Sequence, residues 1–452
     1  MKLTRNLFGI AALSLCLGFA SCSDDDELPY SEAQVTNAEL RVILEKQGIQ
    51  FDEMGHMLLD DKVQNLTTLD LSGTKFTDFQ ALTILPNLVE LNLSNNEFGP
   101  TFDFAILPAQ INAVDLTGNT IYYFENLVKT DEAGDNAQMV RDFTKLYLPV
   151  SAKYNCSEVP AYFKVDKDVD MKLGSEAYTT LREIPDAKWR GMLNKLFPSV
   201  FTEDGKVDVS KRMFKGEEVG QSITTINYDE RTMTVDDVEG FQYIVNNPGY
   251  TGTYVYMEAT KECTVDYFPA GHSVTDINIV RVNTPNGFDL SKCPTFRYLE
   301  SQFNKGLKTV DLTDSKAWGQ RGDAEERGSF PSNLTLLSCI NLESVILPEN
   351  AKTFGSVKLI NSPKLKNVDL SKIETFNSLS LGGLASDCKI QYPQFLRFLK
   401  PDYPHWAFSI DEPIAKMPET KAVLDAHHKD FILSIIPGGH GVKQYNYFQD
   451  YK

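Results

Sequence analysis

The sequence predicts a β-rich α/β fold, a solenoid made of two tandem capped modules of short parallel strands. Three observations support this prediction. One short phrase occurs three times between residues 66 and 121, and its leading residues lie 22 and then 23 positions apart. Further along the chain, apolar-x-apolar triplets recur at spacings that are mostly 10 to 12 residues. Each array also follows a segment whose apolar residues recur at helical spacing.

The repeated phrase has the same polarity pattern in each copy. The copies are Leu69-Asp-Leu71-Ser-Gly-Thr74, Leu91-Asn-Leu93-Ser-Asn-Asn96 and Val114-Asp-Leu116-Thr-Gly-Asn119. Alternate residues of a strand point to opposite faces, so the apolar residues face the core and the middle residue faces outward. The pattern resembles the leucine-rich repeat, L-x-x-L-x-L-x-x-N-x-L, whose period is about 20–29 residues. The resemblance implies the fold but no particular ligand, because such arrays bind many unrelated partners.

Residues 1–22 have the features of a lipoprotein signal peptide. An apolar run over residues 7–17 is too short to span a bilayer comfortably. It ends in Gly18-Phe-Ala-Ser-Cys22, which resembles a bacterial lipobox and implies lipidation of Cys22. The alternative is ordinary secretory cleavage near Ala20 or Ser21.

An acidic tether over residues 23–33 follows this segment. Its first residues, Ser23-Asp-Asp-Asp-Glu27, resemble the export signal of surface-exposed lipoproteins in Bacteroidota-type bacteria. We therefore expect an outer-membrane lipoprotein that is exposed on the cell surface and attached through its N-terminal lipid. A solvated spacer is the simpler alternative for this run of charges.

Composition argues against several function classes. A net charge of −18 disfavours a nucleic-acid partner, because phosphates are bound by clustered Lys and Arg. Five cysteines remain beyond Cys22, widely spaced and odd in number, and they are expected to be buried thiols. Neither the Asp204-Gly205 turn nor the histidines near residues 427 and 440 have metal-ligand spacing. With no catalytic motif either, we expect no enzyme activity, no cofactor and no metal site.

The first module is expected over residues 34–155 and begins with a helical cap. Thr36 or Asn37 is placed as the N-cap of that helix. After the three repeats, Leu146-Tyr-Leu148 indicates one more strand. Residues 156–180 break the pattern and are expected to form a junction, with residues 165–173 alternating like an exposed strand.

The second cap is expected over residues 181–220. Pro185 is placed near the start of a helix whose buried face carries Trp189, Met192, Leu193 and Leu196. Together with Glu203-Asp-Gly-Lys-Val-Asp208, this segment resembles the "IPDxxFRxxL…DGxIS" cap that precedes leucine-rich repeats in many bacterial surface proteins.

The second module is expected over residues 221–390, and its repeats differ from those of the first. The triplets begin at Ile277, Phe288, Leu299, Val310, Leu334, Val345, Val357, Val368 and Leu379. A half-period near 11 residues predicts two strands per repeat, on opposite sides of the coil. Residues around 223–226, 254–256 and 263–268 are expected to be degenerate first repeats. The phrases at residues 288–292 and 368–372 resemble BspA-like and internalin-like repeats of bacterial surface proteins, which implies an adhesive, non-catalytic function.

A C-terminal cap is expected over residues 391–452. Within it, residues 395–399 and 421–426 have apolar spacing compatible with helices.

Two sets of residues are candidates for ligand contact. Outward positions of the strands form a possible ligand-facing strip: Asp70, Glu90, Asn92, Asp115, Asp289, Asp311 and Asp369. These positions could bind a basic protein patch or a sugar, or could only keep a regular sheet soluble. Tyr254 and Tyr256 are possible stacking aromatics for a glycan, with core packing as the alternative.

The leading functional hypothesis is binding of an extracellular protein or a host or matrix ligand. The alternatives are an accessory glycan-binding lipoprotein of a nutrient-uptake system and a structural envelope protein.

Overall fold

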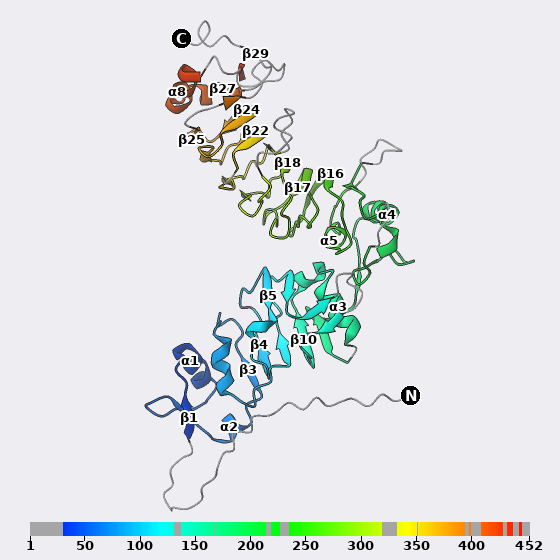
Figure 1. Cartoon of the computed structure of the whole chain (residues 1–452), viewed down its shortest axis with the longest axis vertical. Helices are drawn as coiled ribbons and strands as arrows, with labels where there is room; N and C mark the ends of the chain where they lie inside the picture. The colour runs from blue at the N-terminus through cyan, green and yellow to red at the C-terminus, as the bar shows by residue number, and fades with distance from the viewer. Residues whose placement is uncertain are drawn as a thin grey trace, which may run out of the picture.

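The computed structural model contains helices and strands arranged in two arrays of parallel strands, and no sheet among the described residues is closed. Figure 1 shows one array from blue to cyan and the other from green to red. Helices α3 (Glu158–Val165), α4 (Ala187–Leu196) and α5 (Gln242–Val245) lie where the two arrays meet. The structure describes residues 30–130, 137–166, 168–213, 218–226, 235–318, 332–349, 351–393, 397–398, 408–427, 432–436 and 443–444. Cys22 and the expected signal peptide lie outside these residues.

The N-terminal cap consists of a helix beside a small antiparallel sheet. Strands β1 (Tyr30–Gln34) and β2 (His56–Leu58) pair antiparallel, so the last residues of the expected tether belong to a strand. Helix α1 (Ala38–Lys46) lies between them in sequence, and the short helix α2 (Asp61–Gln64) follows. Asn37 is the N-cap of α1, because its Oδ1 accepts the Leu40 N–H at 2.9 Å. The predicted helix and one of its two predicted caps are therefore confirmed.

The first sheet has six strands in the order β12-β11-β10-β6-β4-β3. Their bounds are β3 (Thr68–Asp70), β4 (Glu90–Asn92), β6 (Ala113–Asp115), β10 (Lys145–Leu148), β11 (Asp170–Leu173) and β12 (Glu176–Ala177). Parallel pairing places Leu69, Leu91, Val114 and Leu146 in one row. All four side chains are fully buried. Each such burial contributes about 1.5–3 kcal/mol, which explains why the apolar positions of the phrase fix its register.

Residues 156–180, which we expected to join the modules, contain helix α3 (Glu158–Val165) and strand β11. Strand β11 pairs parallel with β10 and extends the first sheet, and Met171 is buried in the first core. Shorter pairs lie outside this sheet: β5 (Thr101–Asp103) with β7 (Tyr123–Glu125), and β8 (Val128–Thr130) with β9 (Ala137–Met139).

The second cap is built around helix α4 (Ala187–Leu196) and the small pair β13 (Leu181–Arg182) and β14 (Val207–Asp208). Asp186 is the N-cap: its Oδ1 accepts the Lys188 and Trp189 N–H groups at 2.8 and 3.0 Å. As predicted, Trp189 and Leu193 are fully buried, and the indole Nε1 donates to the Val238 carbonyl at 2.9 Å.

The second sheet has eleven strands and is parallel except at its last pair, β28 with β29. Its path is β15 (Ile223–Thr224), β16 (Tyr254–Thr264), β17 (Asp276–Asn283), β18 (Tyr298–Gln302), β20 (Asn333–Leu337), β22 (Thr353–Ser362), β24 (Thr375–Leu384), β27 (Phe408–Asp411), β28 (Leu433–Ile436) and β29 (Lys443–Gln444). The eleventh strand, β26 (Arg397–Phe398), pairs with β24 beside this path. The triplets at Ile277, Leu299, Leu334, Val357 and Leu379 pair in register. Strands β15 and β16 confirm two of the expected degenerate repeats.

The intervening triplets form separate two-stranded sheets. Strand β19 (Thr309–Asp311) pairs with β21 (Ser344–Ile346), and β23 (Asn367–Asp369) pairs with β25 (Lys389–Gln391). The prediction of two strands per repeat is therefore correct in this part of the chain.

In the C-terminal segment, the structure confirms one of the two helices that the sequence predicts. Helix α8 (Pro418–His427), which follows α7 (Glu412–Ala415), contains the predicted helix at 421–426. The expected helix at 395–399 is wrong, because β26 (Arg397–Phe398) pairs parallel with β24. Pairing with the neighbouring strand outweighs the local helical spacing here.

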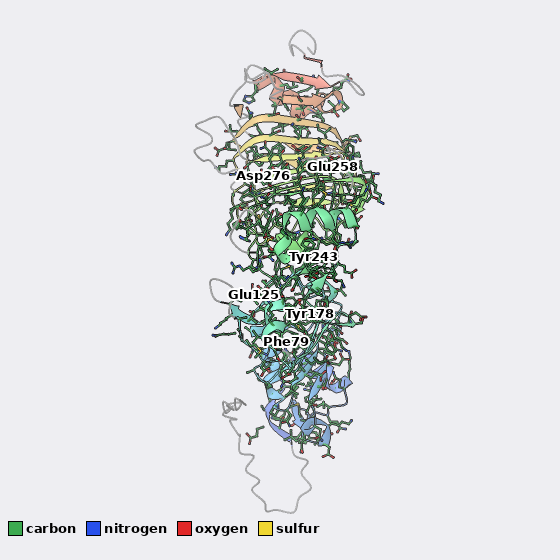
Figure 2. The ribbon with its side chains drawn as sticks, turned by 90° about the vertical axis from the view of Figure 1, so that its right-hand side faces the viewer. Phe79, Glu125, Tyr178, Tyr243, Glu258 and Asp276 are labelled. Atoms are coloured by element: carbon green, nitrogen blue, oxygen red, sulfur yellow. The ribbon has the colours of Figure 1, made fainter. Side chains whose placement is uncertain are left out.

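The two cores meet in a cluster of tyrosines near the end of the first array. The rings of Tyr122 and Tyr267 stack at 3.7 Å between centroids and 7° between planes. The Tyr154 hydroxyl donates to Glu239 Oε1 at 2.5 Å. Figure 2 places Tyr243 between the two arrays, with Tyr178 and Glu125 on one side and Glu258 and Asp276 on the other. Side chains from both arrays therefore share one packed junction.

Candidate ligand-binding faces

The first sheet brings four of the predicted strip residues onto one face. Parallel register places Asp70, Asn92 and Asp115 in one row, and Glu90 lies in the neighbouring row. All four are exposed or half-buried. The alternation of the short strands thus places these side chains as the sequence predicts.

Each of these row residues also ends its own strand. The Oδ1 atoms of Asp70, Asn92 and Asp115 accept backbone N–H groups two residues further on, at 3.0, 3.1 and 2.9 Å. The same bond recurs in the second array at Asp289, Asp311 and Asp369. These are Asx turns, in which a side-chain oxygen replaces a backbone acceptor as the chain leaves the strand. One side-chain oxygen of each residue is therefore committed to the fold.

A cluster on the same face was missed by the sequence prediction. The ammonium groups of Lys145 and Lys172 lie 4.6 and 4.3 Å from the ring centroid of Tyr147. The Tyr147 hydroxyl donates to Asp170 Oδ2 at 2.6 Å, and Lys145 Nζ is 2.5 Å from Glu90 Oε1. Burial alone would lower the pKa of Lys145, but the hydrogen bond and charge of Glu90 raise it above its ordinary value.

The residues of this cluster are visible in the sequence, but their proximity follows only from the strand pairing. Lys145 and Tyr147 alternate within β10, and Lys172 belongs to the segment expected to be a junction. Only the pairing of β10 with β11 sets Lys172 beside Tyr147.

The three remaining strip residues do not share one row. Asp311 lies on β19 and Asp369 on β23, in two different two-stranded sheets. Asp289 points into the junction, where its Oδ2 accepts the Tyr123 hydroxyl at 2.9 Å and the Tyr267 hydroxyl at 3.2 Å. For Asp289 the structure thus shows a packing role, and ligand contact by Asp311 and Asp369 stays a prediction.

The second sheet carries the predicted aromatic pair on its outward face. The rings of Tyr254 and Tyr256 lie 6.3 Å apart with 28° between their planes, and both are half-buried. Register sets Tyr254 across from Asp276, and Asp276 across from Tyr298. Tyr254 and Tyr298 therefore flank the Asp276 carboxylate, and Tyr256 lies across from Asn278. Three other aromatic residues of this part of the chain, Phe241, Tyr243 and Tyr250, are buried in the core.

Tyr298 was also missed, although a repeated spacing could have revealed it. Tyr256 and Tyr298 each precede a glutamate by two positions, and their hydroxyls donate to Glu258 and Glu300 at 3.0 and 2.8 Å. Burial, followed by the bond to Glu258, raises the pKa of Tyr256 to about 12. Burial and Glu300 raise the pKa of Tyr298 as well. The patch is therefore aromatic and acidic, and its phenols stay neutral at physiological pH.

The thiols of the described residues are buried, except that of Cys263, which is half-buried. The five cysteines of the described chain are unpaired thiols, and burial raises the pKa of Cys156 to about 12. The described residues contain no group of three potential metal ligands and no helix long and apolar enough to cross a membrane. The glycine-rich histidine segment at 438–441 lies outside them.

Comparison with known proteins finds a family match within the first array. Residues 64–102 match the family model described as Leucine Rich repeats (2 copies). No curated protein matches the chain. One similar solved structure is a leucine-rich repeat protein of Leptospira interrogans, with 11% identity and a TM-score of 0.20 over 83% of this chain and 98% of that chain. The matched segment runs from the last residue of α2 through β3 and β4 into β5, and it contains the first two copies of the repeated phrase.

Proposed function

We propose that this chain is a lipid-anchored cell-surface protein that binds an extracellular protein through the outward face of its first sheet, without catalysis. The observation that carries the proposal is the Tyr147 cluster beside the row Asp70, Asn92 and Asp115. Arrays of leucine-rich repeats present extended surfaces of this kind to macromolecules.

The chemistry of this face suits a protein partner. A tyrosine held in place by two lysines offers a large contact area that loses little conformational entropy on binding. The acidic row beside it provides charge that a basic patch would complement. Binding of such a partner is expected to weaken as salt rises, because the charged residues are exposed or half-exposed.

The test is a binding screen with the lipid-free chain, residues 23–452, against extracellular matrix and mucin proteins. Tyr147→Ser and Lys172→Glu are expected to weaken the strongest interaction by about tenfold, equal to about 1.4 kcal/mol. Tyr30→Ser is the matched control, because Tyr30 is 39% exposed on β1, outside both sheets. Equal loss in Tyr30→Ser, or none in the two face variants, would place the binding surface elsewhere.

The lipid anchor has its own test. Lipid labelling of the full chain in a bacterial host is expected to depend on Cys22. If Cys22→Ser is labelled as strongly as the unaltered chain, the lipobox interpretation is wrong.

Glycan binding is the second candidate, favoured by the outward stack of Tyr254 and Tyr256 near Tyr298. Tyr254 and Tyr298 are separated by two strand spacings, about 9.6 Å, which suits rings stacking on alternate sugars of one chain. Saturable binding of a soluble polysaccharide, lost in the Tyr254→Ala/Tyr256→Ala variant, would support it. If the double variant binds as well as the unaltered chain, the stack is not the site.

A further inference from the structure

One tyrosine on the outward face of the second sheet, Tyr298, is flanked by two carboxylates. Glu300 follows Tyr298 by two positions on β18, and parallel pairing sets Asp276 of β17 directly across from Tyr298. The Tyr298 hydroxyl donates to Glu300 Oε2 at 2.8 Å. The ring is half-buried, and the described residues place neither a cation nor another ring against it. An aromatic face beside anionic groups is a favourable place for a cation.

The charge of both carboxylates is uncompensated within the described part of the chain, because only neutral groups bond to them. The Thr275 hydroxyl donates to Asp276 Oδ2. The Tyr298 hydroxyl and Gln302 Nε2 donate to the two oxygens of Glu300, the second at 2.5 Å. An ionised carboxylate has about four lone-pair sites, so both side chains can accept further donors.

The cations elsewhere on this face do not neutralise these two carboxylates. Arg281 is engaged with a different acid, because its Nη2 lies 2.6 Å from Glu258 Oε1. Lys358 lies in the same row as Glu300 but two strand spacings away, about 9.6 Å. Neither cation is therefore placed to pair with Asp276 or Glu300.

A third acceptor lies between the carboxylates. Asn278 on β17 is across from Glu300, and alternation along the strand places it on the same outward face. Its Oδ1 atom is buried and has no hydrogen-bond partner among the described residues. A buried acceptor without a donor is destabilising, so a ligand N–H that reaches Asn278 would make a bond that the free protein lacks.

Tyr147 on the first sheet shows how a similar arrangement is completed within the chain. There too one charged residue, Lys145, lies two positions away, and another, Lys172, lies directly across on the neighbouring strand. Both are cations, and their ammonium groups lie over the ring at 4.6 and 4.3 Å from its centroid. The equivalent positions around Tyr298 carry the opposite charge, so a cation that packs on this ring has to come from another molecule.

From these contacts we propose that the outward face of β16 to β18 binds an arginine side chain of a protein partner. The guanidinium plane packs on Tyr298, and its N–H groups donate to Asp276 and Glu300. Arginine fits better than lysine, because its flat group stacks on an aromatic ring while its fork of five N–H donors bonds carboxylates. A neutral sugar fits less well, because the hydroxyls of Tyr256 and Tyr298 already donate to glutamates and the acceptors that remain are mostly charged. The site lies on a different sheet from Tyr147, so its test is separate from that of the proposed function.

Calorimetric titration of the lipid-free chain, residues 23–452, tests the proposal at physiological salt. The probes are hexa-arginine, hexa-lysine, hexa-citrulline and cellohexaose. Citrulline has nearly the shape of arginine without its charge, and cellohexaose is a neutral sugar chain. Hexa-arginine is expected to bind most tightly and hexa-lysine more weakly. Hexa-citrulline and cellohexaose are expected to bind at least about tenfold more weakly than hexa-arginine, because neither offers a cation.

Three variants locate the binding, and circular dichroism shows that each is folded. Asp276→Asn/Glu300→Gln removes both charges with little change of shape and is expected to weaken hexa-arginine binding about tenfold. Tyr298→Leu removes the aromatic ring and is expected to weaken binding about fivefold. Tyr298→Phe keeps the ring and loses only the hydroxyl, so its affinity is expected to stay within about twofold of that of the unaltered chain.

Asp314→Asn/Glu343→Gln is the matched control. Both side chains are exposed acids of the second array outside this face, and neither forms an ion pair with a described residue. The control removes the same number of negative charges as the double variant of the site. It is expected to weaken hexa-arginine binding less than about twofold, since salt screens distant charges.

The proposal is supported if hexa-arginine binds, and if the double variant of the site and Tyr298→Leu weaken this binding more than the control does. It is overturned if hexa-arginine does not bind, or if hexa-lysine, hexa-citrulline or cellohexaose binds as tightly. It is also overturned if either folded site variant binds as tightly as the unaltered chain, or if the control loses as much affinity as the double variant.

Discussion

Two buried asparagines, Asn119 and Asn96, stabilise the first array through hydrogen bonds, and their number of bonds predicts how much stability each substitution would cost. Asn119 is 6% exposed, and its amide makes four hydrogen bonds to backbone groups. Its Oδ1 accepts the Asn96 and Phe98 N–H groups at 2.9 and 3.0 Å. Its Nδ2 donates to the Leu93 and Leu116 carbonyls at 3.0 and 2.8 Å. The side chain thus connects one repeat to the repeat before it.

The side chains at the equivalent position of the two preceding repeats also hydrogen-bond to the backbone, but they make fewer bonds. Asn96 Nδ2 donates to the Leu71 and Ser94 carbonyls at 2.9 and 3.2 Å, and its Oδ1 accepts the Lys75 N–H at 2.7 Å. Thr74, at the matching position of the first repeat, donates to Leu71 and accepts from Phe76. The number of bonds therefore falls from four to three to two along equivalent positions.

Substitution by Ala removes these bonds and leaves buried backbone groups unpaired. At about 1 kcal/mol net for each bond, Asn119→Ala is expected to cost about 4 kcal/mol, Asn96→Ala about 3 and Thr74→Ala about 2. Thr74 is only partly buried, so water can satisfy its former partners and its true cost is expected to be lower still.

Hydrogen exchange, measured by mass spectrometry over residues 88–122, reports the loss of backbone protection in this part of the array. Urea unfolding followed by circular dichroism gives the change in the free energy of unfolding. Tryptophan fluorescence serves as a second probe, because Trp189 and Trp318 are buried in the core of the second array. The reasoning fails if Asn119→Ala costs less than about 1 kcal/mol, or if Thr74→Ala costs as much as Asn119→Ala.

Three further predictions concern stability and reactivity. Gly99→Ala is expected to cost about 2 kcal/mol or more, because a Cβ at φ +142° would lie 1.8 Å from the Thr120 carbonyl oxygen. Gly191→Ala, with nothing within 4 Å, is expected to stabilise α4 by about 0.5–1 kcal/mol, and both shifts are read from urea midpoints. The folded chain is expected to react slowly with a thiol reagent. Cys263 is expected to react first, because it is only half-buried. Fast reaction of all five thiols would contradict their raised pKa values. Tyrosines such as Tyr256 ionise near 10 when unfolded but at about 12 when folded, so stability is expected to fall as pH rises through that window. The tyrosinate absorbance that a Tyr256→Phe variant lacks should appear together with the loss of circular dichroism, and its appearance near pH 10 with the fold intact would refute the linkage.

Much of the fold follows from the spacing of apolar residues. Leu69, Leu91 and Val114 predict the register of the first sheet because a shift by one residue would expose every one of them. The half-period of the second array likewise predicts that Val310 and Val345 pair apart from the long sheet. Periodicity is a strong signal wherever one face of a strand must be buried.

The side chains of the candidate faces were harder to interpret from sequence. Asp70 and Asp115 were identified as outward residues, but the Ser or Thr two positions later also marks an Asx turn. The Tyr147 cluster could not be predicted, because Lys172 lies in a stretch without the repeat phrase and reaches Tyr147 only through the pairing of β10 with β11.

The junction was also beyond sequence reasoning, since its contacts join residues more than 80 positions apart. Asp289 and Tyr267 from the second array meet Tyr123 from the first, and no repeat pattern relates them. The stack of Tyr122 on Tyr267 and the bond from Tyr154 to Glu239 sit at partly or fully buried positions. A hinge would have to break these contacts in order to move. The relative position of the two sheets is therefore set by packing, so a ligand that contacts both arrays would bind without first ordering the protein.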